Sequence, residues 1–464
     1  MTHTWRAGLT ALMFSAGAAA AMSAANPGVS LVGTGFIPGD GTDLSGLAGM
    51  PICQRDTPSV CIDQATLGGL GSAVAYTGFE NLFLAVPDRG PFDGRTTVPY
   101  LDRFNVVRLT LDTTAAFPNI QPVLVRTPLL KNDRNQNLVG DAYAFDTTNP
   151  RNTLRFDPEG VTMNAAGNFF VSDEYGPFIY EFTLNGRMLR RITVPGKFLL
   201  DPKTGHQSGD LDAPGGNSLE LYPSFNVTGR QANRGMEGLT ITPDGRTLVG
   251  IMQNALLQDH GIDPSSISRV GENNRILTID LLNGRTHEYV YVMDAVNQGK
   301  GVNEIVAIND HEFLVLERDN RTMVPTPPNT AKQMPNLKRI YKIDLAKPGL
   351  TDVAEVKSLP ATAAELAALS IVPVTKTLFI DLLDPSYMVN ATQTIKDVIA
   401  EKVEGLTWGP ALNDGRQVLY VFSDNDLFPG LPTQIYAFAI DTAAAHITYQ
   451  PPSFPLSCLL FGKC

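Results

Sequence analysis

Short apolar strands separated by polar turns recur along most of this chain. Five segments share an alternation of apolar and small or polar positions, at residues 70–75, 158–163, 236–241, 302–307 and 403–408. Each is followed by a polar turn, such as Asp244-Gly245 or Asp414-Gly415, and then by a second apolar segment. Asx-Gly turns between alternating apolar segments are a strong signal for β-hairpins. A third short strand follows in every unit, so the pattern predicts repeated antiparallel sheets.

Repeated sheets of three or four short strands are typical of β-propeller blades. We therefore predict an all-β fold, a β-propeller with long inserted loops and short helices on one face. Five blades are explicit, and we expect residues 30–36 and 376–383 to supply a sixth that closes the ring. Five or seven blades remain possible. The alternative fold is a stacked pair of β-sandwiches, in which the repeats would share no single axis.

The segments inserted between strands differ from them in composition. Residues 131–149 are rich in Asn and Asp, residues 203–217 in Gly and Asp, and residues 321–336 in Pro, which predicts loops. Residues 361–369 and 391–399 have a helical composition. Because functional sites are often built on loops held by a rigid scaffold, we expect the site on the face that carries these insertions.

A glutamate stands near the start of the first strand in four of the five repeats. These residues are Glu159, Glu237, Glu304 and Glu404. Propeller symmetry places equivalent positions around one axis, so they should meet at one mouth of the central channel. Acids at the ends of the adjacent strands could join them. The metal ligands predicted in this way are Asp88, Glu159, Asp173, Glu237, Glu304, Glu317, Glu404 and Asp424.

Such a crowd of carboxylates is repulsive unless cations lie between them or their pKa values rise. Numerous, flexible oxygen ligands favour Ca²⁺, which is therefore the predicted cofactor. The alternative is that each glutamate caps its own blade by accepting hydrogen bonds from backbone N–H groups.

Three arginines accompany these acids. Arg89 and Arg318 follow the same strand in their respective blades, and Arg234 precedes Glu237 by three residues. A guanidinium group in an acidic ring either pairs with an acid or holds a phosphate or carboxylate of a ligand. We expect pairing with an acid more strongly for Arg234 than for Arg89.

Composition and missing motifs narrow the function classes. The chain of 464 residues carries a formal net charge of −11, which argues against a nucleic-acid-binding surface. It has no Gly-x-Ser-x-Gly motif, so ordinary serine-hydrolase chemistry is unsupported. Its histidines beyond residue 25 stand in no strong metal-binding spacing.

The N-terminal segment predicts export. Residues 1–25 combine Arg6, an apolar run and a small-residue cleavage site, as in a secretory signal, although a membrane anchor is the alternative. We predict a secreted or periplasmic protein with one propeller domain over residues 26–445, a tail over residues 446–464, and no membrane span once the signal is removed. Export also makes two local disulfides plausible. The predicted pairs are Cys53 with Cys61 and Cys458 with Cys464.

These motifs together resemble the family named for the esterase-like activity of phytase, a relative of the β-propeller phytases. The resemblance covers roughly residues 45 to 442, and its motifs lie at residues 86–91, 157–160, 171–177, 233–239, 314–319 and 403–410. It implies an exported propeller, a calcium-dependent site in the channel, and hydrolysis of phosphate or carboxylate esters. The first repeat departs from the pattern because Gly71-Ser72 replaces an acid, which puts one metal ligand in doubt.

We therefore expect a calcium-dependent hydrolase of a small anionic ester, acting as a monomer. The predicted catalytic residues are Glu174 and Glu237, which would orient or deprotonate water, and Arg89 and Arg318, which would clamp the anion. The predicted substrate-binding residues are Arg89, Arg234, Arg318 and Tyr175. Two alternatives are a non-catalytic, calcium-stabilised extracellular binding propeller and a lactone or sugar-ester hydrolase with one central calcium.

Overall fold

The computed structural model describes most of the chain, and the blades lie entirely within the described ranges. These are residues 26–92, 96–146, 152–176, 178–199, 227–231, 233–266, 268–294, 301–324 and 331–452. The predicted signal segment and the predicted pair Cys458 and Cys464 lie outside the described residues.

The repeated hairpins form antiparallel sheets of four strands, each of which is one blade. Blade 1 contains β4 (Ala73–Tyr76), β5 (Leu82–Val86), β6 (Asn105–Leu111) and β7 (Ile120–Arg126). Blade 2 contains β8 (Pro158–Met163), β9 (Phe169–Asp173), β10 (Ile179–Phe182) and β11 (Met188–Ile192). Blade 3 contains β12 (Met236–Ile241), β13 (Thr247–Met252), β16 (Asn273–Asp280) and β17 (Thr286–Val292).

The last two blades each recruit an outer strand from a distant segment. Blade 4 contains β18 (Gly301–Ala307), β19 (Glu312–Arg318), β20 (Lys338–Asp344) and β21 (Lys376–Asp381). Blade 5 contains β22 (Lys402–Gly409), β23 (Gln417–Asp424), β24 (Thr433–Ile440) and the N-terminal strand β1 (Val29–Ile37). The register pairs Val29 with Ile440 and Ile37 with Thr433, so the two ends of the propeller are joined in one sheet.

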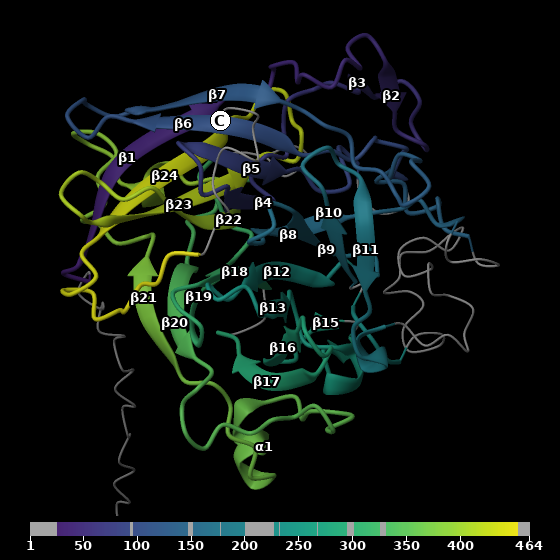
Figure 1. Cartoon of the computed structure of the whole chain (residues 1–464), viewed down its shortest axis with the longest axis vertical. Helices are drawn as coiled ribbons and strands as arrows, with labels where there is room; N and C mark the ends of the chain where they lie inside the picture. The colour runs from purple at the N-terminus through teal and green to yellow at the C-terminus, as the bar shows by residue number, and fades with distance from the viewer. Residues whose placement is uncertain are drawn as a thin grey trace, which may run out of the picture.

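Five blades, and not six, surround the axis in the described part of the chain. The inner strands follow one another as β4, β8, β12, β18 and β22, and β22 lies against β4 again (Figure 1). The predicted sixth blade is wrong because its two segments pair elsewhere. Residues 30–36 belong to β1 of blade 5, and residues 376–383 contain β21 of blade 4.

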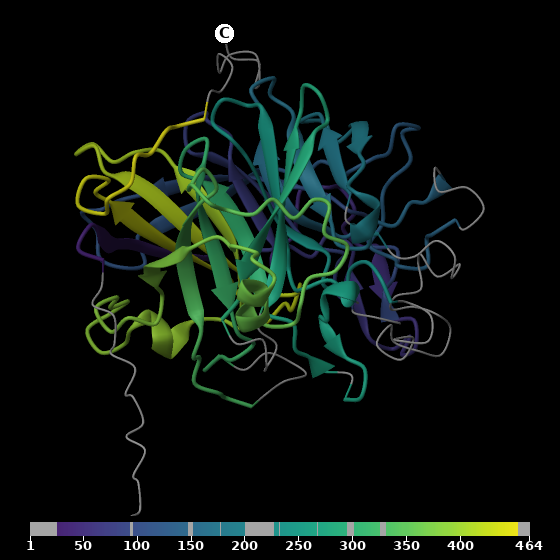
Figure 2. The ribbon, with the colours of Figure 1, turned by 90° about the horizontal axis from the view of Figure 1, so that it is seen from below.

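A hydrophobic core fills each space between neighbouring blades, as side chains from facing sheets pack together. Between blades 1 and 2, for example, Phe104 and Phe169 lie with ring centroids 4.8 Å apart. Comparable clusters join the other four pairs of blades. The side view in Figure 2 shows the blade strands packed side by side around the axis.

Short helices and short strands lie in the connections between the blade strands. The helices α1 and α2 form inside the two segments of helical composition, and each follows a threonine whose backbone N–H and hydroxyl donate to a carboxylate in the first turn. Within the described residues no helix is long and apolar enough to cross a membrane. The remaining bounds are α1 (Ala363–Ala368), α2 (Ile395–Val398), η3 (Gly196–Phe198), η5 (Leu257–Asp259), β2 (Pro51–Cys53), β3 (Cys61–Asp63), β14 (Ile262–Asp263) and β15 (Ser268–Arg269).

The Glu-Gly pairs of the inner strands have a packing reason. A Cβ atom on Gly160 would lie 2.5 Å from the backbone nitrogen of Leu239, and one on Gly238 would lie 2.7 Å from that of Ile305. Neighbouring inner strands therefore approach closely only because these positions lack a side chain.

One end of the channel holds a small, largely apolar cavity. Its lining includes Trp408 and Tyr449, whose ring centroids lie 4.5 Å apart. The backbone N–H of Gln450 donates to the carbonyl of Ile308 at 2.8 Å, which fixes the C-terminal segment across this end. In Figure 1 this yellow segment runs toward the centre of the ring.

Candidate functional site

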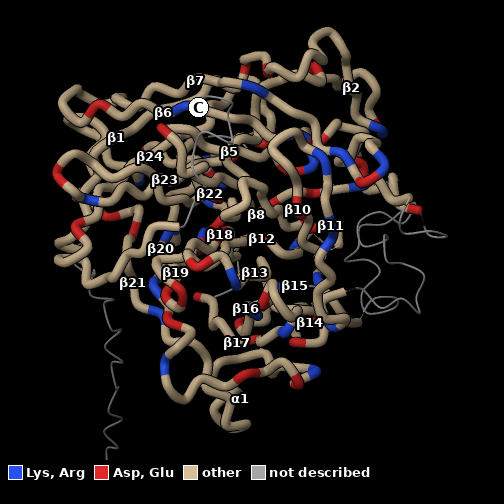
Figure 3. Tube along the Cα trace, in the orientation of Figure 1, with Lys and Arg blue, Asp and Glu red and all other residues tan. Residues whose placement is uncertain are grey.

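A cavity of about 640 Å³ opens where the inner strands begin and the second strands of the blades end. Acidic and basic positions occur along all five blades (Figure 3), and this cavity concentrates both kinds. Among the described residues, seven acids and four basic side chains line it. They are Asp88, Glu159, Glu174, Glu237, Glu401, Glu404 and Asp426, with Arg89, Arg234, Arg318 and Lys402.

A β-bulge directs one side chain of each bulged inner strand toward the axis. The register shifts between Pro158 and Val161 in β8, and it shifts at equivalent places in β12, β18 and β22. Bulges are known to re-aim side chains near functional sites. The residues at the bulges are Glu159, Glu237, Asn303 and Glu404.

The predicted equivalence of Glu304 with the other glutamates is wrong by one residue. In β18 the bulge falls on Asn303, whose Nδ2 donates to Oε1 of Glu237 at 2.9 Å and to Oε1 of Glu404 at 3.4 Å. Glu304 instead accepts hydrogen bonds from the backbone N–H groups of Leu239 at 3.0 Å and Ile305 at 2.9 Å. Glu304 therefore caps backbone groups of two inner strands, as in the alternative considered for these acids.

A first group of acids lies where blades 1 and 5 meet. Carboxylate oxygens of Asp88, Asp424 and Asp426 lie within 4.8 Å of one another. Asp88 follows β5, whereas the two others end β23 and begin the turn after it. Lys402, at the start of β22, forms an ion pair with Asp426. One cation could bridge the three carboxylates.

A second group lies at the start of blade 2. Oxygens of Asp157, Glu159 and Glu174 also lie within 4.8 Å of one another, and all three side chains are buried. The guanidinium Nη1 of Arg89 donates to Asp157 at 2.8 Å and lies 3.5 Å from Glu174. The backbone N–H of Arg89 also donates to Asp157 at 3.0 Å, so the loop after β5 is fixed to blade 2.

Burial makes these carboxylates resist ionisation. Burial raises the pKa of Asp88 to about 7 and the pKa of Asp157 to about 6, although a neighbouring arginine acts in the opposite direction. Burial and then adjacent carboxylates raise the pKa values of Glu159, Glu237 and Asp424 well above their usual range. Uptake of protons or binding of a cation therefore stabilises such a group of carboxylates.

The arginines differ in their partners. Arg89 pairs with acids of the second group, and Arg318 pairs with Glu404. Among the described residues, Arg234 donates only to the carbonyl of Asn233 at 2.6 Å and to Oε1 of Gln253 at 2.7 Å. The stronger pairing with acids is therefore that of Arg89, which reverses the order expected from the sequence.

Three further predicted residues, Asp173, Tyr175 and Glu317, belong neither to the cavity lining nor to the two acid groups. Asp173 accepts hydrogen bonds from the backbone N–H groups of Asp157, Tyr175 and Gly176, so it caps the turn after β9. Tyr175 is buried, and its hydroxyl donates to the carbonyl of Gly140 at 2.7 Å.

Glu317 lies between blades 3 and 4, away from the channel. Its carboxylate accepts hydrogen bonds from Tyr291, from the ammonium group of Lys376 at 2.6 Å and from the backbone of Asp294 at 2.9 Å. The structure therefore brings Asp88, Glu159, Glu237, Glu404 and Asp424 together, but not Asp173, Glu304, Glu317 or Tyr175.

Sequence reasoning did not assign a role to two polar residues of the site, Asp157 and Gln253. Asp157 lies two residues before Glu159, so an Asp-x-Glu spacing was the available signal, whereas Asp426 is one of the acids at strand ends that were expected to join the ring. Gln253 donates to Oε1 of Glu237 at 2.5 Å, but its position at the end of β13 gave no such signal.

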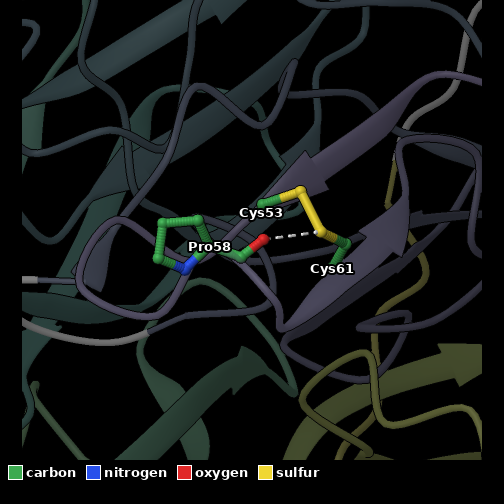
Figure 4. Close-up of a disulfide and its surroundings, with 3 residues drawn as sticks. All are labelled: Cys53, Pro58 and Cys61. Carbon is green, nitrogen blue, oxygen red and sulfur yellow. Dashed lines mark hydrogen bonds between the residues drawn. A yellow bond between two sulfur atoms is a disulfide. The ribbon is translucent and has the colours of Figure 1, made fainter.

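A disulfide-closed hairpin forms part of the cavity rim. Strands β2 and β3 are joined by the bond between Cys53 and Cys61, which confirms the first predicted pair, and Sγ of Cys61 lies 3.4 Å from the carbonyl oxygen of Pro58 (Figure 4). Gln54 and Val60 of this hairpin line the cavity. The rim therefore depends on a covalent link that suits an oxidising compartment.

A protein of Arthroderma benhamiae named "Uncharacterized secreted protein" is 30% identical over 322 residues, which are 57% of this chain and 62% of that protein. The chain thus spans less than two thirds of that relative. The crystal structure of an ancestral GH74 enzyme aligns with 85% of this chain and 39% of its own, with 11% identity and a TM-score of 0.35, values too low to bear on fold or function.

A family model gives the decisive match. The model described as "Phytase-like: Esterase-like activity of phytase" matches residues 65–427, which run from the start of blade 1 into blade 5. Membership suggests a hydrolase-like or esterase-like function, and the name of the fungal relative and the disulfide fit an exported protein. The chain therefore belongs to the phytase-like family named for the esterase-like activity of phytase.

Proposed function

We propose that this protein is an exported, calcium-dependent hydrolase that cleaves phosphate or carboxylate esters in the acidic cavity. The observation that carries the proposal is the pair of three-carboxylate groups beside one cavity that also holds guanidinium groups. Family membership supports hydrolysis but leaves the substrate and the metal open.

The residues present fit calcium. Both groups supply only oxygen ligands, and their buried carboxylates are too crowded to ionise freely. Oε2 of Glu237 is buried and has no hydrogen-bond partner among the described residues, so it is an acceptor that a cation, a proton or a water molecule would satisfy. We assign one ion to Asp88, Asp424 and Asp426 and one to Asp157, Glu159 and Glu174.

Calcium, when bound, supplies positive charge that neutralises the anionic group of the substrate and stabilises the charge developing during ester cleavage. The protein contributes the positions of the acids. Arg89 and Arg318 hold three of them through ion pairs and add positive charge near the anion.

Glu237 is the residue to which we assign proton transfer. Gln253 and Asn303 fix its Oε1, which leaves Oε2 to hold a proton or to accept one from water. Burial, and then the charges of Glu174 and Glu404, raise the pKa of Glu237 well above its usual range, so this carboxyl group is suited to hold a proton. Glu174, held by the backbone N–H of Gly235 at 3.2 Å, is positioned to orient the same water.

The test is hydrolysis of p-nitrophenyl phosphate and p-nitrophenyl acetate, measured with calcium and with a chelator. We expect turnover of at least one ester only with calcium, and a loss of about 10²–10⁴-fold in kcat for Glu237→Gln. The matched control is Glu181→Gln, a buried glutamate of blade 2 bonded to Asn164 and Arg190 outside the cavity, which should keep its activity. Absence of hydrolysis under every metal condition would instead support the non-catalytic binding propeller.

A further inference from the structure

One cation of the cavity, Arg234, forms no ion pair with a carboxylate of the described residues, although its charge acts against the raised pKa of the nearby Glu237. Arg89, Arg318 and Lys402 each form an ion pair with a carboxylate of the site. Arg234 is bonded to neutral oxygens of Asn233 and Gln253, and no carboxylate among the described residues pairs with it. Both known bonds use Nη1, so the other N–H groups of the guanidinium remain for an anion.

The surroundings of Arg234 reinforce its positive charge. Arg269, on β15, has a pKa lowered to about 9, first by burial and then by the nearby charge of Arg234, while Glu174 acts in the opposite direction. Two guanidinium groups that repel each other mark a region where an anionic ligand group would be stabilised.

The cavity also has an apolar wall. Phe92 and Phe428 line it, each four residues after an acid of the first group, namely Asp88 and Asp424. Pro91 and Val60 extend the wall toward the rim. An aromatic or aliphatic body of a ligand would be desolvated against this wall.

The charge balance limits how many anionic groups a ligand can bring. Nine carboxylates line the cavity or belong to its two groups, against four basic side chains, which leaves five excess negative charges if all are ionised. Two divalent ions would nearly cancel this excess. The loaded cavity is therefore close to neutral and suits one anionic head group, whereas a ligand with six phosphates would be repelled.

We propose that the cavity selects monoesters that carry one anionic head group on an apolar body, such as aryl phosphates, with Arg234 binding the head group and Phe92 and Phe428 contacting the body. This inference rests on the calcium-loaded site proposed above, but it concerns ligand binding and not turnover.

The experiment measures Kd by calorimetry for three probes on the calcium-loaded full chain. These are 1-naphthylmethylphosphonate, which cannot be hydrolysed, methylphosphonate, which has only the head group, and inositol hexakisphosphate. We expect the naphthyl probe to bind most tightly. Arg234→Gln should weaken both phosphonates about tenfold or more, with a smaller loss for Arg234→Lys.

Phe92→Ala should weaken the naphthyl probe about fivefold and leave methylphosphonate unchanged, because only the body touches the ring. Arg416→Gln, an exposed arginine paired with Asp414, is the matched control. A thermal melt of every variant separates a loss of binding from a loss of folding.

Tighter binding of inositol hexakisphosphate, or an unchanged Kd for methylphosphonate in a folded Arg234→Gln variant, would overturn the inference. Calcium-dependent hydrolysis without these preferences would leave the proposed function intact. Arg234-dependent binding of the naphthyl probe without any hydrolysis would preserve the inference and refute the proposed hydrolase activity.

Discussion

Replacing Asp88 by Asn should make the protein more stable without calcium and less stable with it. Asp88 is buried, and its pKa is raised from 3.8 to about 7, mainly by that burial. The folded state therefore keeps a proton that the unfolded state loses between these two values. Stability falls as the pH rises through this window, and the full loss is present above pH 7.

The size of the effect follows from the same shift. About three pKa units correspond to about 4 kcal/mol of stability lost by the native protein at pH 8. Asn cannot ionise, and its side-chain oxygen can still accept the hydrogen bond that Asp88 receives from Gly90 at 3.0 Å. Even half of the value would raise the Tm of the variant by about 2 °C at pH 8, and by little at pH 4.

With calcium bound, the native protein should instead be more stable than Asp88→Asn. A ligand at 1,000 times its Kd stabilises the native state by about 4 kcal/mol, and Asp88→Asn removes one of the proposed ligands. The assay is a thermal melt at pH 4 and pH 8, with chelator and with calcium.

The matched control is Asp173→Asn. Burial also raises the pKa of Asp173 to about 7, but its carboxylate caps a backbone turn outside the cavity. This variant should keep the full calcium response. An Asp88→Asn variant that gains no stability in chelator at pH 8, or that calcium stabilises as much as the native protein, would refute the reasoning.

Three further predictions use the same melts. Asn303→Asp adds a fourth carboxylate to the bulge positions, so the Tm in chelator at pH 8 should fall while the stabilisation by calcium grows; an unchanged Tm would contradict the assigned ring. Asp102 is buried, neither side-chain oxygen has a hydrogen-bond partner among the described residues, and burial raises its pKa well above its usual range, so Asp102→Asn should gain about 1–3 kcal/mol at pH 8 and little at pH 4; equal gains at both would point to packing instead. Gly238→Ala should destabilise the protein by about 1–3 kcal/mol because the added Cβ meets the backbone of β18, whereas Gly284→Ala, at an open turn, should cost less; the opposite order would argue against close packing of the inner strands.

Local hairpins could be predicted from the sequence, but the pairing of distant strands could not. Alternating apolar positions and turns such as Asp244-Gly245 identify the first three strands of each blade because these strands are neighbours along the chain. The fourth strands of blades 4 and 5 are β21 and β1, which are separated from their partners by a long insertion or by nearly the whole chain. Their patterns show that they are strands without showing which sheet they join. For this reason a sixth blade was wrongly predicted from them.

The candidate site was predicted in outline for a similar reason. Equivalent positions in the repeats brought Glu159, Glu237 and Glu404 to one cavity. Whether a bulge falls on Asn303 or Glu304 depends on the register with β19, which a glutamate one residue away does not reveal. The partners of the arginines depend on contacts between blades. The sequence therefore could not show that Arg234 donates to neutral oxygens of Asn233 and Gln253.

The pairing of β1 with β24 sets an order for maturation. The first strand to leave the ribosome or a translocation channel completes a sheet with one of the last, so the ring cannot shut until nearly the whole polypeptide has emerged. The half-made propeller would leave β1 without its partner strand, and this unpaired edge is a hazard for aggregation until β24 has emerged. This late closure also brings Asp88 of blade 1 next to Asp424 and Asp426 of blade 5. The proposed calcium site between these blades would therefore form only at the end of folding.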